Sequence, residues 1–82
     1  MARPSLFPQY HSTILREIAK ASEERRRAPS IRDLADVCNV SVSTMHDYLA
    51  RIVERGELDW RPRSHRAVKL TESGWAAVHA AR

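Results

Sequence analysis

Histidine and cysteine are the residue types with which this sequence could bind a metal or form a covalent intermediate. The lone cysteine, Cys38, stands at an inward-facing position of a helical pattern, which favours a packed thiol over a nucleophile. With Gly56 and Gly74 as its only glycines, the chain has no glycine-rich phosphate loop. The four histidines are scattered, with no pair at metal-ligand spacing beside a carboxylate: His11, His46, His65 and His79. We therefore expect a non-enzyme without a metal or a cofactor.

A basic run in the last third of the chain offers a different chemistry, the binding of anions. Residues 60–69 hold four cations and no acid, whereas residues 30–56 hold three basic and four acidic side chains. The formal net charge is +4. A run of cations is often only a solvated face, but it also suits phosphate groups. The elements that position the run must decide between these readings.

The apolar spacing predicts a mainly α chain with one small β-hairpin. The expected helices span about 9–24, 31–38, 42–55 and 72–81, with the hairpin at about 57–70. A chain of 82 residues, 43% hydrophobic and 29% charged, has room for one core, so we expect a single domain over 1–82. The lone cysteine excludes an intramolecular disulfide and fits a reducing cytosol. The apolar runs are short, so we expect neither a membrane span nor a signal segment.

Capping residues place the ends of these helices. Ser30 followed by Asp33 has the form of a capping box, with Asp where Glu is usual. Asn39 tolerates the left-handed backbone of a tight turn, and Ser41 can cap the next helix. Gly56 is expected to end that helix. Two helices therefore meet across a short turn.

The string A-D-V-C-N-V-S-V-S-T-M-H-D-Y-L, from Ala35 to Leu49, resembles the helix-turn-helix of bacterial and phage repressors. The small Ala35 lets the helices cross closely, Val40 fills the angle between them, and Met45 packs inward. Asn39 stands where Gly is usual in the motif. Three helices, then a hairpin, then a helix is the order of a winged helix-turn-helix.

The segments P-S-I-R-D-L-A and V-E-R-G-E-L, followed by the basic hairpin, look like the DNA-binding domain of LexA-type repressors. The segment L-T-E-S-G also resembles MarR-type regulators, but these dimerise through extra helices for which this sequence has no counterpart. LexA continues into a self-cleaving serine/lysine protease domain, and this chain ends at Arg82 before one. We therefore expect no self-cleavage, and Met1 with the terminal helix favours a complete small protein.

The resemblance implies sequence-specific binding of double-stranded DNA by a small transcriptional regulator, most simply a repressor. The second helix of the motif would lie in the major groove, where short polar side chains contact base edges, and the wing would follow phosphates or the minor groove. The candidate base readers are Val42, Ser43, Thr44, His46 and Asp47. The candidate backbone or minor-groove contacts are Arg51, Arg61, Arg63, His65, Arg66 and Lys69.

Two further expectations concern partners. Asp47 would repel phosphate, so the alternative reading is a winged helix used as a protein-protein interaction module. The small footprint of one helix and one wing favours a homodimer, or paired monomers on two half-sites, with Trp75 and Val78 of the terminal helix as a contact. We expect no small-molecule ligand and a cytoplasmic, nucleoid-associated location.

Overall fold

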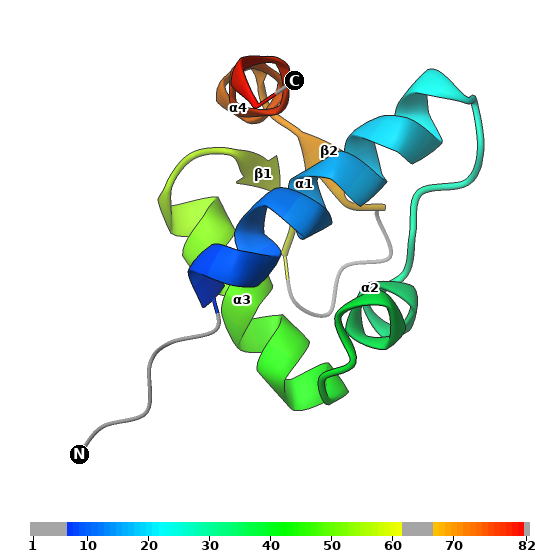
Figure 1. Cartoon of the computed structure of the whole chain (residues 1–82), viewed down its shortest axis with the longest axis vertical. Coiled ribbons are helices and arrows are strands. Elements are labelled where there is room, and N and C mark those ends of the chain that lie inside the picture. The colour runs from blue at the N-terminus through cyan, green and yellow to red at the C-terminus, as the bar shows by residue number, and fades with distance from the viewer. Residues whose placement is uncertain (1–6, 62–66, 82) are drawn as a thin grey trace.

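The computed structural model describes residues 7–61 and 67–81 and has the predicted winged helix-turn-helix arrangement. The elements are α1 (Phe7–Glu23), α2 (Ile31–Cys38), α3 (Val42–Glu54), β1 (Leu58–Asp59), β2 (Lys69–Leu70) and α4 (Glu72–Ala80). Figure 1 shows α1 across the middle of the molecule, with α4 on one side and α2 and α3 on the other. The strands β1 and β2 pair antiparallel, with Leu58 opposite Leu70 and Asp59 opposite Lys69. The prediction of a mainly α fold with a small hairpin is confirmed.

The first helix begins two residues before its predicted start. Phe7 is buried, and its ring lies 5.5 Å from His11 and 5.7 Å from Tyr48 between centroids. Pro8 follows in the first turn, where its missing N–H has no intrahelical partner to lose. The burial of Phe7 therefore extends the helix in the N-terminal direction beyond what the proline signal indicated.

The other boundaries differ by small amounts. Helices α1, α3 and α4 each end one residue before their predicted ends, at Glu23, Glu54 and Ala80. The residues after α3 and α4 are C-caps whose N–H groups still bond to helix carbonyls. The paired strands cover only two residues each, less than the predicted 57–70, of which 62–66 lie outside the described residues.

The predicted caps of α2 are present. The Asp33 N–H donates to Ser30 Oγ at 3.0 Å, and the Ser30 N–H donates to Asp33 Oδ2 at 3.0 Å. The backbone hydrogen bond from Ser30, then that of its side chain, holds the pKa of the Asp33 carboxyl below its ordinary value. Asn39 ends α2 in the left-handed region, at φ 56°. Local side-chain chemistry thus fixes both ends of this short helix.

The core is built from the inward faces of all four helices and the hairpin. Its most deeply buried large side chains are Ile14, Leu34, Met45, Leu49 and Ile52. Two positions on α3 differ from the prediction: Val53 is only half-buried, and Tyr48 is buried against the rings of Phe7 and Tyr10. The helix turns a wider apolar face inward than the sequence pattern suggested, because α1 supplies aromatic partners on that side.

Cys38 is a core thiol, as predicted. Its side chain is 3% exposed within the cluster that joins α1, α2 and α3. Burial raises the pKa of the Cys38 thiol, and the negative charge of Glu17 adds to the rise. A protonated, enclosed thiol is a poor nucleophile, so its role is packing.

Helix α4 docks closely on the turn between α3 and β1. Thr71 caps α4, accepting a hydrogen bond from the Gly74 N–H at 3.1 Å, and its own N–H donates to the Glu57 carbonyl at 3.2 Å. Gly74 is buried, and a Cβ at this position would overlap the Glu57 carbonyl oxygen. The absence of a side chain at Gly74 is what lets the helix approach the turn.

We expect Gly74→Ala to destabilise the fold by about 1–3 kcal/mol, because the added methyl group meets rigid backbone rather than a flexible side chain. Urea unfolding followed by circular dichroism measures the change. Ser73→Ala, at an exposed position of the same helix, is the control and should stay within about 0.5 kcal/mol of the wild type. A Gly74→Ala protein as stable as the control would contradict the close approach.

Candidate nucleic-acid interface

The corner between α2 and α3 fixes the direction in which α3 leaves the core. The left-handed conformation of Asn39 turns the chain, and the Val40 N–H donates to the Ala35 carbonyl at 3.0 Å. Ala35 is buried at the helix crossing and Val40 is half-buried in the angle. The predicted mechanical roles of these three residues are thus present in the structure. They direct α3 so that one side packs on the core and the other faces solvent.

The outer face of α3 carries four of the five predicted base readers in exposed positions. Val42 is 37% exposed, and Ser43, His46 and Asp47 are also exposed. Their spacing of three and four residues places them on one side of the helix over its first two turns. The face offers one apolar contact, one hydroxyl, one imidazole and one carboxylate.

The fifth predicted reader, Thr44, is half-buried and has a partner inside the protein. Its hydroxyl accepts a hydrogen bond from Ser41 Oγ at 2.9 Å, while its backbone N–H donates to the same oxygen at 3.1 Å. Thr44 and Ser41 together cap the N-terminus of α3. The hydroxyl of Thr44 therefore contributes first to the helix start.

His46 also has a partner, which the sequence gave no sign of. Its ring lies edge-on to the indole of Trp60, with the centroids 5.4 Å apart and the planes at 60°. Trp60 is half-buried against the core, directly after β1. The contact joins the outer face of α3 to the base of the hairpin.

The predicted backbone contacts divide into those that the structure describes and those that it does not. Arg51 is exposed on α3, and its guanidinium lies 5.4 Å from the centroid of the Phe7 ring. Arg61 follows Trp60 and is exposed, and Lys69 is exposed on β2. The others lie outside the described residues: Arg63, His65 and Arg66.

A polar cluster behind this face was missed by the sequence interpretation. His11 Nε2 lies 2.6 Å from Glu57 Oε1, and Arg55 Nε donates to the same oxygen at 3.1 Å. Both partners of the first pair are largely buried, with side chains 15% and 12% exposed. His11 and Glu57 are 46 positions apart, so no sequence pattern could have paired them. The cluster ties α1 to the end of α3.

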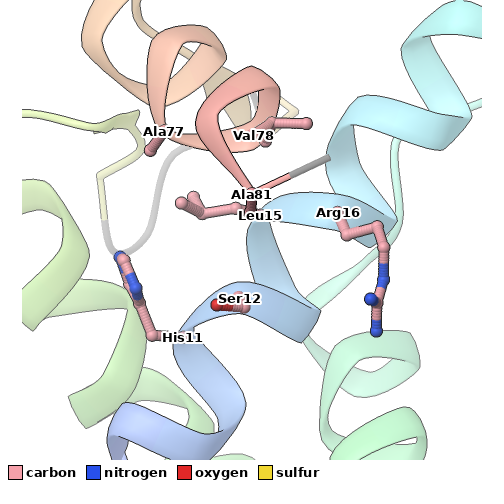
Figure 2. A pocket seen from close by; sticks show the side chains of 7 residues that line it. All are labelled: His11, Ser12, Leu15, Arg16, Ala77, Val78 and Ala81. Atoms are coloured by element: carbon pink, nitrogen blue, oxygen red, sulfur yellow. The ribbon is translucent and has the colours of Figure 1, made fainter.

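A hollow of about 290 Å³ between α1 and α4 is the other candidate region, shown in Figure 2. Its lining is His11, Ser12, Leu15, Arg16, Ala77, Val78 and Ala81. His11 and Arg16 stand at opposite ends of the hollow, with the small side chains of α4 across from them. Since Glu57 engages the His11 ring, the lining does not offer the convergent polar groups typical of a ligand site.

Within residues 7–61 and 67–81, no three histidine, cysteine or acidic side chains gather where they could hold a metal ion. None of the helices in these ranges combines the length and the apolar character needed to cross a bilayer. Val78, which the sequence suggested as a dimer contact, is buried in the monomer, and Trp75 is half-buried.

Comparison with known proteins confirms the resemblance to LexA-type repressors. Over 66 residues, or 79% of this chain, the sequence is 35% identical to LexA repressors of Lactobacillus johnsonii and Lactobacillus gasseri, and 32% identical to that of Oenococcus oeni. The chain spans about a third of the length of these curated relatives, 32% of the first two and 31% of the third. No protein-family model matches the chain, and no solved structure matches it.

The cap at the start of α3 leads to a stability prediction. We expect Ser41→Ala to cost about 1 kcal/mol, because the Thr44 N–H loses its acceptor at the helix terminus. Thermal or urea unfolding measures the loss. The matched variant Ser43→Ala, exposed in the first turn of the same helix, should change stability by less than about 0.5 kcal/mol. Equal losses in both variants would argue against the capping role.

Proposed function

We propose that this LexA-like winged helix binds double-stranded DNA sequence-specifically as a small transcriptional regulator, acting as a repressor. The observation that carries the proposal is the exposed outer face of α3 in a chain similar to LexA repressors. A capped helix held at a fixed angle to the core fits the major groove, and its first turns then face the base edges.

The exposed residues of α3 have distinct roles in this proposal. Val42 offers an apolar contact to a thymine methyl group, Ser43 donates to or accepts from a base, and Asp47 accepts from the amino group of cytosine. Thr44 and His46 contribute from positions where each already has a partner inside the protein.

The attraction to phosphate comes from elsewhere. Residues 30–56 carry four acids against three bases, so the reading helix itself does not draw in a polyanion. Arg51 and Arg61 are exposed at the far part of α3 and at the base of the hairpin, and the basic run continues to Lys69. We infer that α3 supplies sequence preference and that the wing, with Arg51, supplies most of the affinity.

The alternative is a protein-interaction module. The observation that favours it is Val37, which is 52% exposed on α2, in the helix pair that also presents Val42. An exposed apolar pair at a corner of near-neutral charge suits a protein partner. Affinity for DNA that is absent at low salt, or that does not respond to salt, would support this alternative.

The wing leads to a prediction about salt dependence. We expect the triple variant Arg61→Ala, Arg63→Ala, Arg66→Ala to lower the slope of log affinity against log salt by about 2–3 units, at ~0.9 per phosphate released. Affinity should fall about equally for all duplex sequences, because phosphate contacts carry no base information. Fluorescence anisotropy on one labelled duplex across a salt series measures the slope.

The matched control removes the same charge from a different place. Arg25, Arg26 and Arg27 form an exposed basic run between α1 and α2, and their triple alanine variant should change the slope much less. Equal effects of the two triple variants would mean that only net charge matters, and the wing contact would be wrong.

The exposed face of α3 leads to a prediction about sequence preference. We expect Ser43→Ala and Asp47→Ala each to alter preference at particular base pairs, by about 1–3 kcal/mol for a good contact, with the fold intact because both positions are exposed. Selection of bound sequences from random DNA, for each variant and the wild type, measures the change. Identical preferences in all three proteins would remove α3 as the base reader.

A further inference from the structure

The contact between His46 and Trp60 joins two parts of the proposed interface. His46 stands on the exposed face of α3, between the proposed base readers Ser43 and Asp47. Trp60 is the residue from which the chain enters the basic run at Arg61. Their rings meet edge-on at 5.4 Å, a favourable geometry because the positive edge of one ring faces the negative face of the other.

Each ring is held on its own side. Trp60 follows the buried Leu58 by two residues of extended chain, so both side chains lie on the same side of the hairpin and reach the core. His46 is fixed by α3, which is capped at its start and packed along its inner face. A ring contact between two anchored elements sets the angle between them.

A second histidine–tryptophan pair in the chain has no such consequence. Trp75 and His79 lie four residues apart within α4, with ring centroids 5.9 Å apart. Their contact joins two turns of one helix and orients no second element. The pair is therefore a natural control for the loss of an exposed histidine next to an indole.

We propose that His46 is a positioning residue that acts through Trp60: its ring fixes the wing relative to α3, so that base reading and phosphate contact are coupled. The inference rests on the proposed binding of DNA and refines it, because it gives His46 a role other than that of a free base reader. It implies that removing the ring contact weakens the wing's phosphate contacts although no cation has been removed.

The test compares ring-deleting and ring-preserving variants on one duplex across a salt series. We expect His46→Ala to lower the salt slope by about one to two phosphates, at ~0.9 each, and Trp60→Leu to do the same. The double variant should lower it no further, since both changes remove one contact. His46→Phe keeps an aromatic ring against Trp60 but has no ring nitrogen, so its slope should stay at the wild-type value.

The outcomes separate the alternatives. If His46→Phe loses as much as His46→Ala, the imidazole contacts DNA directly, and the positioning role is wrong. His79→Ala should leave the slope unchanged, and an equal loss there would show that the effect is not specific to this contact. His46 is exposed, so its two variants decide the question even where Trp60→Leu alters the fold.

A measurement on the free protein keeps the inference separate from the proposed function. We expect the His46 ring protons to have NMR shifts displaced by the Trp60 ring current, and this displacement to vanish in Trp60→Leu. Unchanged His46 shifts in that variant would overturn the positioning role while leaving DNA binding in place. A wild-type protein that shows the displaced shifts but binds no duplex at low salt would instead refute the proposed function, and the coupling to DNA with it.

Discussion

The turn between α3 and β1 holds four elements of the fold together through backbone groups. Gly56 adopts φ 78°, which lets the chain reverse directly after α3, and the next carbonyl accepts the N–H of Thr71 at the start of α4. The Thr71 hydroxyl donates to the Gly56 carbonyl, and the Glu57 carboxylate bonds to His11 on α1. These bonds require α4 to come within contact of the turn, which the hydrogen side chain of Gly74 permits. Without that approach, the hairpin and α4 would lose their shared anchor.

The same turn gives α3 a fixed C-terminal end, and the Asn39 corner with the Ser41 cap gives it a fixed beginning. A helix held at both ends keeps its outer face in one orientation, which recognition of base edges requires. The weak negative balance of residues 30–56 means that orientation alone would not hold a polyanion. The basic run after Trp60 supplies that attraction in the proposed function, so the contact between the two parts has a consequence for both.

The local rules of the sequence determined much of this architecture. The capping box at Ser30, the left-handed Asn39 and the cap at Ser41 depend on residues within a few positions of one another, so composition and spacing were enough to find them. The exposed positions of α3 followed from helical periodicity for the same reason. For the proposed readers, the pattern identified the face of the helix correctly, including the exposed Asp47, because the face is set by spacing alone.

The tertiary structure decided what no local rule contains. It placed His46 against Trp60 and His11 against Glu57, and it buried Tyr48 under the rings of α1, where the pattern had indicated Val53. Each of these contacts joins side chains that are far apart in the chain and meet only after the helices have packed. Periodicity states which way a side chain points from its own helix. The partner that it meets there depends on the crossing angles and on the shapes of the other elements, and these are properties of the folded core as a whole.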